Sequence, residues 1–144
     1  MNQPSNRKTT EELRQILAET KTIAVVGLSD RPERPIYGVA SYLQGQGYRI
    51  IPVNPNLSKV LGEKAYPNLR DIPEPVDVVD VFRRSEHVPG VVEDAIAIGA
   101  KVIWLQLGVI HEEAAAQAEA AGLTVVRNNC MGATHSSLRS MGKS

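Results

Sequence analysis

The stretch IAVVGLSDRPERP, residues 23–35, decides the fold of this chain. Its first four residues form a continuous apolar run, which is typical of a β-strand buried on both faces. Gly27 ends the run, and a polar loop then leads to Pro35, whose fixed backbone suits the first turn of a helix. The stretch therefore predicts a strand, a sharp turn and a helix in direct succession.

The same alternation continues along the rest of the chain. Further strands are predicted from apolar runs at 48–53, 76–82, 101–107 and 123–126. Helices are predicted from apolar spacing and caps at 9–20, from 35 to 45 or 47, at 85–99 and at 111–121. Residues 57–75 are interpreted as an irregular excursion with one helical turn at 68–71. The pattern predicts an α/β fold: a single doubly wound, Rossmann-like domain with a parallel sheet of about five strands and helices on both faces.

Length and composition restrict the classes of protein. We expect one domain over residues 1–144, with a flexible N-terminus at 1–8 and a loose tail at 136–144. Sixteen Lys and Arg balance sixteen Asp and Glu, and aromatic residues are few, which argues against nucleic acid as a partner. A single Cys excludes an internal disulfide and Cys-rich zinc modules. With no signal peptide or membrane span recognised, we expect a cytoplasmic protein without a membrane partner.

The first strand-to-helix turn is the candidate binding site. In doubly wound folds, ligands bind beyond the carboxyl ends of the strands, and this turn often holds a phosphate. Gly27 permits a sharp turn, Ser29 supplies a hydroxyl and an amide, and Arg31 and Arg34 add positive charge. The helix that starts near Pro35 points free amides at the same place. The alternative is a loop that only connects two elements and whose arginines are solvated.

The loop differs from a dinucleotide fingerprint in two respects. Only Gly27 stands for the three glycines of G-x-G-x-x-G. The acid that would hold an adenosine ribose after the second strand is replaced by Val53-Asn54-Pro55. Both differences count against NAD and against a hydride-transfer enzyme.

Other groups of chemically capable residues do not form a recognisable catalytic or metal site. Asp77 and Asp80 have odd spacing on a strand, so they are expected to face opposite sides of the sheet. The three histidines, at 87, 111 and 135, have no metal-ligand spacing and are interpreted as solvated or capping residues. Cys130 has no evident helix N-terminus beside it and is expected to be buried and unreactive, and Trp104 is expected in the core. The tail at 142–144 matches only the end of a P-loop.

Several blocks of sequence, in order at the ends of predicted strands, together resemble one family. They are IAVVGLS at 23–29, RP at 34–35, PVNP at 52–55, VDVFR at 79–83, WLQLG at 104–108 and NC at 129–130. On these blocks the chain is similar to the stand-alone CoA-binding domain proteins of bacteria and archaea. It is also similar to the N-terminal domain of the succinyl-CoA synthetase alpha chain and of NDP-forming acyl-CoA synthetases. The resemblance covers roughly residues 20–135.

The resemblance implies a Rossmann-like fold that binds coenzyme A or an acyl-CoA. It places the pyrophosphate on the loop after Gly27, at Leu28, Ser29, Asp30, Arg34 and Pro35. It places the adenosine at Val53, Asn54, Pro55, Phe82 and Arg83. The pantetheine arm then extends toward Gln106, Leu107, Gly108, Asn129 and Cys130. Either Lys59 or Arg83 pairs with the 3′-phosphate.

The sequence departs from the family near its end. Many relatives have Asp-Arg-Cys and then Glu-His where this chain has Asn128-Asn129-Cys130 and Thr134-His135, although 129–132 is close to the Asn-Cys-x-Gly of the synthetase alpha chains. The synthetases phosphorylate a histidine in a further domain, which we do not expect here. The favoured interpretation is a non-catalytic module that binds CoA or an acyl-CoA, with a protein partner left open. The alternatives are a subunit of an acyl-CoA-processing enzyme complex and an NAD-type redox sensor.

Overall fold

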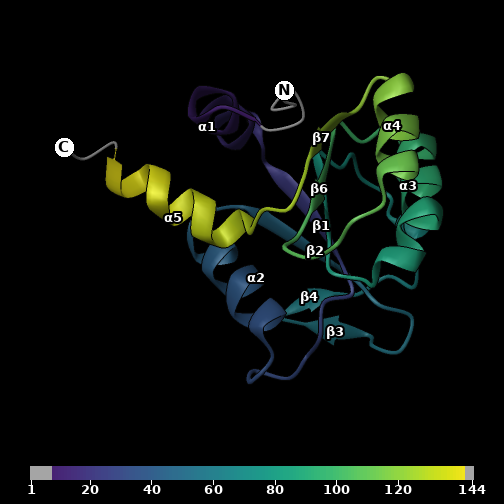
Figure 1. The fold of residues 1–144 in the computed structure, drawn as a ribbon. Coiled ribbons are helices and arrows are strands. Elements are labelled where there is room, and N and C mark those ends of the chain that lie inside the picture. The colour runs from purple at the N-terminus through teal and green to yellow at the C-terminus, as the bar shows by residue number, and fades with distance from the viewer. Residues whose placement is uncertain (1–7, 142–144) are drawn as a thin grey trace.

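The structure, a computed structural model, describes residues 8–141 (Figure 1). Its centre is a five-stranded parallel sheet with the strand order β2-β1-β5-β6-β7. The strands are β1 (Thr22–Val26), β2 (Arg49–Val53), β5 (Val78–Val81), β6 (Val102–Leu105) and β7 (Thr124–Val126). Each coincides with one of the predicted apolar runs, so the five predicted strands are confirmed.

Helices pack on both faces of the sheet (Figure 1). One face is covered by α1 (Thr10–Glu19), α2 (Pro35–Gly45) and α5 (Met131–Met141). The other face is covered by α3 (Val88–Ala97), which follows the short 3-10 helix η3 (Ser85–His87), and by α4 (Glu112–Ala120). Neighbouring residues of β1 alternate between the two cores: Ile23 and Val25 belong to one, Ala24 and Val26 to the other. The predicted doubly wound α/β fold is confirmed.

Local sequence signals account for where three helices begin. Thr9 Oγ1 accepts from Glu12 N–H at 3.1 Å, and Glu12 Oε1 accepts from Thr9 N–H at 2.8 Å, which closes a capping box on α1. Pro35 is the first residue of α2, as its fixed φ favours. His111 Nδ1 accepts from Ala114 N–H at 3.1 Å and caps α4, which confirms the capping role predicted for a histidine.

Residues 57–75 are more ordered than the sequence predicts. They contain an antiparallel pair, β3 (Lys59–Val60) and β4 (Glu63–Lys64), followed by the short 3-10 helix η2 (Leu69–Asp71), which confirms the predicted helical turn. Tyr66 donates to Pro52 O at 3.0 Å, and its own carbonyl accepts from Asn54 N–H at 2.9 Å. The segment is thereby tied to the end of β2. Two-residue strands are too short to show alternation, so the pattern could not reveal them.

The prediction of a loose tail from residue 136 is wrong as far as Met141, because α5 continues to that residue. Met131 and Leu138 are buried in the same core as Trp104, and Gly132 lies against Val39. Burial of these few side chains holds a helix whose sequence is otherwise polar. The P-loop-like residues 142–144 lie outside the described residues, as does the predicted flexible N-terminus except for Lys8. Among the described residues, no helix is both long and apolar enough to cross a membrane.

Candidate functional site

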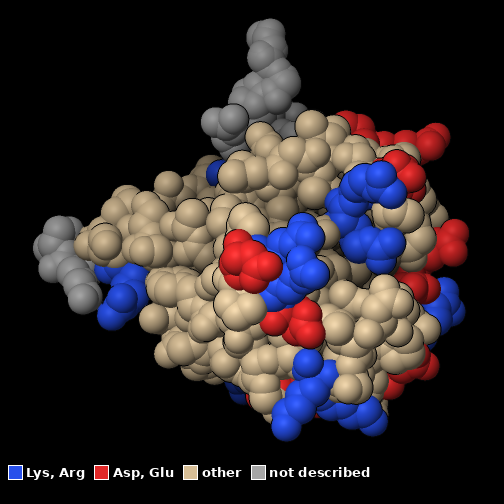
Figure 2. Space-filling model, turned by 90° about the horizontal axis from the view of Figure 1, so that it is seen from below, with Lys and Arg blue, Asp and Glu red and all other residues tan. Residues whose placement is uncertain are grey.

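The strand order locates the binding crevice of the fold. After β1 the chain moves outward to β2, and it then crosses back to β5 on the other side of β1. The loops that follow β1 and β5 therefore leave the sheet in opposite directions, and ligands of such folds bind between them. This carboxyl edge of the sheet lies at the bottom of Figure 1 and faces the viewer in Figure 2, where basic and acidic side chains are interspersed.

Gly27 is required at this point by sterics. Its φ is +95°, and a Cβ atom there would lie 2.7 Å from the carbonyl oxygen of Phe82 and 3.2 Å from the side chain of Arg83. Gly27 N–H donates to Val53 O at 2.9 Å, and Phe82 N–H donates to Val26 O at 3.0 Å. The close approach brings together three segments that the sequence assigned to one site: the ends of β1, β2 and β5.

Asn54 fixes the end of β2 against the loop after β1. Its Nδ2 donates to Leu28 O at 3.1 Å, and its Oδ1 accepts from Asn56 N–H at 2.8 Å. Leu28 is fully buried. Pro55 is exposed. The amide of Asn54 is thus committed to the protein, and its role in a site is to hold the loop in shape.

The rest of the first loop offers amides and positive charge. Ser29 Oγ accepts from Arg31 N–H at 3.1 Å. Arg34 precedes α2 without any side-chain cap, so no side chain occupies the amides of the first helical turn. Asp30, Arg31, Arg34 and Pro35 are all exposed. Such a helix start favours an anion such as phosphate.

The arginines at this edge differ in their partners. Arg31 lies 3.9 Å from Glu33, an exposed pair of little energetic weight. Arg34 and Arg83 form no ion pair within residues 8–141. Arg83 is half-buried, with its aliphatic stem beside Gly27. Two guanidinium groups are therefore available to an anionic ligand.

A cavity of about 290 Å³ opens beside this switch point, between the ends of β1 and β2 and the start of α3. Its lining includes Val26, Val53, Arg83 and His87. Two of these, Val53 and Arg83, are residues that the sequence assigned to the adenosine. His87 was interpreted as a solvated or capping residue, and its place in the cavity was missed. Leu69 and its neighbours 67–68 also line it, because η2 packs against α3.

Lys59 is the predicted site residue that this arrangement does not bring in. It lies exposed on β3, opposite Lys64 in the hairpin. It does not line the cavity beside Arg83, and it takes part in none of the backbone hydrogen bonds that join the described segments at the switch point. Of the two residues suggested for a 3′-phosphate, only Arg83 adjoins the cavity.

Asp80, which the sequence considered only as a possible partner of Asp77, is a buried carboxyl group in the site region. It is fully buried on β5, with Val25 and Trp104 as its neighbours on adjacent strands. Gln106 Nε2 donates to Asp80 Oδ1 at 2.6 Å, whereas Asp80 Oδ2 has no hydrogen-bond partner in the part of the chain that the structure describes. Burial raises the pKa of Asp80 to about 7, opposed by the hydrogen bond from Gln106. Gln106, a predicted site residue, is thus buried, with its amide group committed to Asp80.

Asp77 and Asp80 do not act as a pair, in agreement with their odd spacing. Asp77 lies just before β5 at the opposite end of the strand, where its Oδ2 accepts from Lys21 N–H at 2.9 Å and from Thr22 N–H at 3.0 Å. Among residues 8–141 no three His, Cys, Asp or Glu side chains gather as a metal ion requires.

The loops after β6 and β7 are locked to each other. Asn129 N–H donates to Leu105 O at 3.1 Å, and its carbonyl accepts from Trp104 Nε1–H at 2.9 Å. Asn128, with φ of 49°, accepts at Oδ1 from Gly108 N–H at 3.1 Å. Thr134 Oγ1 donates to Asn129 Oδ1. The predicted pantetheine residues Gln106, Leu107, Gly108, Asn129 and Cys130 therefore lie together at this end of the edge. Trp104 is in the core as predicted.

The interpretation of Cys130 as a buried thiol far from a helix start is wrong. Cys130 is partly exposed, it directly precedes α5, and its carbonyl accepts from Thr134 N–H at 2.9 Å in the first turn. The error follows from the missed helix, because without α5 no helix N-terminus exists near residue 130.

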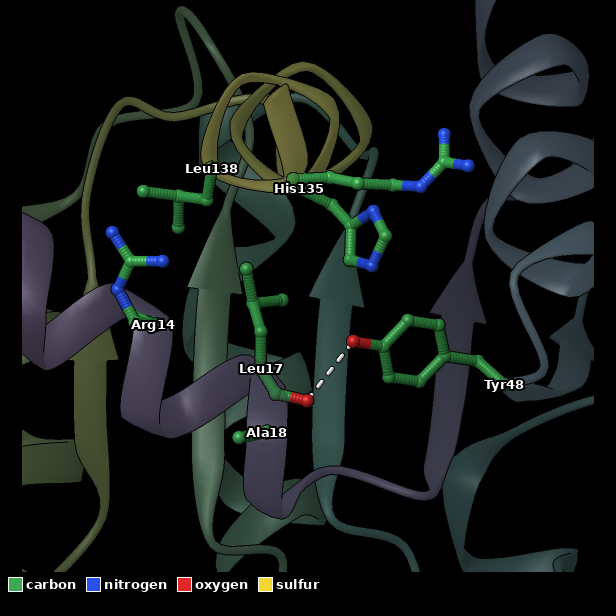
Figure 3. Close-up of a pocket in the computed structure, with 7 residues that line it drawn as sticks. Arg14, Leu17, Ala18, Tyr48, His135 and Leu138 are labelled. Atoms are coloured by element: carbon green, nitrogen blue, oxygen red, sulfur yellow. Dashed lines mark hydrogen bonds between the residues drawn. The ribbon is translucent and has the colours of Figure 1, made fainter. Parts of the chain in front are cut away.

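A separate pocket of about 210 Å³ lies at the other end of the sheet, between α1, α5 and Tyr48 (Figure 3). Tyr48 Oη donates to Leu17 O at 2.9 Å, and the His135 ring faces Tyr48 edge-on. His135 Nδ1 lies 2.9 Å from Tyr42 Oη. Burial and then the charge of Arg139 lower the pKa of His135. His135 is therefore a packing residue between helices, and none of the predicted site residues lines this pocket.

Comparisons with known proteins agree with this geometry. A protein-family model described as a CoA binding domain matches residues 21–136. The uncharacterized protein YneT of Bacillus subtilis (strain 168) is 46% identical over 124 residues, which are 86% of this chain and 92% of YneT. A solved structure, a hypothetical protein from Pyrococcus horikoshii OT3, is 42% identical with a TM-score of 0.92, and the match covers 96% of this chain and 98% of that one.

A larger enzyme also contains a similar segment. Acetate–CoA ligase [ADP-forming] II of Archaeoglobus fulgidus is 35% identical over 83 residues, which are 56% of this chain but only 12% of the ligase. The chain thus corresponds to a small part of that enzyme and to nearly all of YneT. Because the family model spans most of its length, this protein belongs to the CoA-binding domain family.

Proposed function

We propose that this protein binds coenzyme A or an acyl-CoA at the carboxyl edge of the sheet and catalyses no reaction by itself. The observation that carries the proposal is the close approach of Gly27 to Phe82 at the switch point. It lies beside the uncapped start of α2 and two arginines that form no ion pair within residues 8–141. This edge suits a ligand that carries several phosphates. It also suits a ligand whose ribose does not require an acid at the end of β2, where this chain has Val53-Asn54-Pro55. Family membership points to the same ligand.

Within this proposal the ligand runs along the edge of the sheet. The pyrophosphate contacts the backbone of Leu28, Ser29 and Asp30 and the guanidinium of Arg34. The adenosine occupies the cavity of about 290 Å³ beside Val53 and Arg83, with Arg83 near the 3′-phosphate. The pantetheine passes toward Leu107, Gly108, Asn129 and Cys130.

The absence of an intrinsic activity is part of the proposal. At this edge, within residues 8–141, Asp80 is buried in the core and Cys130 has no histidine partner, so no nucleophile is paired with a base. The similarity to one part of an ADP-forming acetate–CoA ligase favours a second candidate, in which the protein is a subunit of an acyl-CoA-processing complex. Turnover of an acyl-CoA by the isolated protein contradicts the non-catalytic proposal.

The first test compares ligands. CoA at one hundred times its dissociation constant is expected to stabilise the protein by about 2.7 kcal/mol, because a ligand that binds only the folded state shifts the unfolding equilibrium. NAD at the same concentration is expected to give a smaller shift in Tm. Thermal unfolding measured with CoA, dephospho-CoA and NAD checks both. A shift with NAD as large as that with CoA contradicts the proposal.

The second test separates the two arginines. Arg34→Ala is expected to weaken CoA and dephospho-CoA equally, by about 10- to 100-fold, because a charge-assisted hydrogen bond to the pyrophosphate is lost. Arg83→Ala is expected to weaken CoA more than dephospho-CoA, which lacks the 3′-phosphate. Arg139→Ala, an exposed arginine at the other end of the sheet, is the matched control and should leave both affinities unchanged. Calorimetric titration measures all three variants. Unchanged affinity in both Arg34→Ala and Arg83→Ala would mean that these arginines are solvated surface residues that do not contact the ligand.

A further inference from the structure

An apolar groove of about 410 Å³ runs from the loops after β6 and β7 along α5 to α1. Among residues 8–141, no Lys, Arg, Asp, Glu or His lines it. Its apolar wall is formed by Leu13 of α1, Leu107 of the loop after β6, and Ala133, Leu138 and Met141 of α5. In Figure 1, α1 and α5 lie beside one another at the end of the molecule away from α3 and α4.

Two of the three exposed large apolar side chains among residues 8–141 line this groove, and the third, Ile110, does not. Leu107 is 65% exposed and Met141 is 51% exposed, and both line it. Apolar surface of this kind, bordered by polar side chains, commonly marks a ligand-binding groove. The polar lining here is formed by Asn128, Asn129 and Thr134, together with Thr10 and Ser137.

The mouth of the groove is held in place before any ligand arrives. The hydrogen bonds of Asn128 to Gly108 and of Asn129 to Leu105 and Trp104 join the two loops to the sheet. Thr134 Oγ1 donates to Asn129 Oδ1 and so fixes the first turn of α5 to the same polar lining. A preformed groove binds a ligand without the entropic cost of ordering its walls.

We propose that this groove holds the acyl group of an acyl-CoA, and that it selects uncharged aliphatic acyl groups over those that end in a carboxylate. The inference rests on the proposed CoA site, because Leu107, Asn129 and Cys130 are both the expected end of the pantetheine and the mouth of the groove. An acyl chain attached to the thiol there enters the groove directly. A terminal carboxylate would lose its water, and no cation from residues 8–141 lines the groove to replace that water.

The test is a series of CoA thioesters titrated by calorimetry against the protein. Affinity is expected to rise from acetyl- to butyryl- to hexanoyl-CoA by up to about fourfold per methylene, the factor that burial of apolar surface supplies. Succinyl-CoA, with the same number of acyl carbons as butyryl-CoA, is expected to bind more weakly than butyryl-CoA. An affinity that does not change along the series, or succinyl-CoA binding as tightly as butyryl-CoA, overturns the inference.

A pair of variants on α5 locates the effect. Ala133 is exposed and lines the groove, so Ala133→Phe fills it and is expected to remove the gain with chain length while free CoA binds as before. Ser136 is also exposed on the same helix but does not line the groove, and Ser136→Phe is expected to keep the full gain. Thermal unfolding of both variants checks that they remain folded.

The outcomes separate this inference from the proposed function. If no CoA compound binds the wild-type protein, the proposed function fails and the acyl groove fails with it. If CoA binds but Ala133→Phe leaves the chain-length series unchanged, only the groove is overturned. If the groove is instead covered by a second copy, Ala133→Phe converts a dimer to a monomer in sedimentation and the thioester series is flat, which also overturns the inference.

Discussion

Asp80 shows, at the scale of one residue, how a buried charge depends on pH. Its carboxyl is fully buried with one hydrogen bond, and its pKa is raised by burial from 3.8 to about 7. The folded state therefore holds a proton that the unfolded state releases between these two values. The free energy of unfolding is therefore not reduced by Asp80 below pH 4. It falls as the pH rises from 4 to 7 and stays at its lower level above pH 7.

Replacement of Asp80 by Asn is expected to remove this loss, because the amide has the same shape and carries no charge. The variant should equal wild type near pH 4 and exceed it above pH 7, by at most about 4 kcal/mol. Urea unfolding at several pH values measures the difference, in which the contribution of His135 cancels. Asp77→Asn is the control, for which the expected change in stability has the opposite sign. Burial alone would raise the pKa of Asp77, but hydrogen bonds from Lys21, Thr22 and Lys101 lower it, so this variant should lose stability at neutral pH.

At the scale of elements, the sequence predicts those that carry their own signal. The five strands of the sheet are runs dominated by Val, Ile and Leu, and Thr9 and Pro35 mark helix starts. The helix α5 has no such signal, because its middle is Thr, His and Ser and it depends on Leu138 and Met131 meeting the core. The candidate site divides in the same way. Gly27 is evident from its loop, whereas the burial of Asp80 and the cavity beside His87 are products of packing between distant segments.

The dependence of α5 on its packing gives a prediction at this scale. Leu138→Ala is expected to destabilise the protein by about 2 to 3 kcal/mol, because it removes buried methyl groups and leaves a cavity where α5 packs on the core. Ser140→Ala, at an exposed position of the same helix, should change stability by less than about 0.5 kcal/mol. Chemical unfolding of the two variants provides the comparison. Equal stability of Leu138→Ala and wild type would mean that the segment beyond residue 136 is the loose tail that its sequence suggests.

At the scale of the whole molecule, the charge balance limits how an anionic ligand is attracted. The chain has sixteen basic and sixteen acidic residues and thus no net charge, so there is no long-range field that draws in a polyanion such as CoA. Attraction must come from the arginines near the switch point, over distances of about the Debye length. Figure 2 agrees with this view, since basic and acidic groups alternate over that face.

Salt dependence of binding separates local from global attraction. Raising the ionic strength from about 0.05 to about 0.5 M is expected to weaken CoA binding, because it screens Arg34 and Arg83 from the phosphates. Uncharged pantetheine should bind with little salt dependence. Arg34→Ala should make the logarithm of the CoA dissociation constant rise less steeply with salt, since one of the few cations involved is gone. Arg139→Ala changes the net charge by the same amount at the other end of the sheet and should leave the slope as in wild type. Equal slopes in Arg34→Ala and wild type, or an equal reduction in both variants, would contradict a local origin of the attraction.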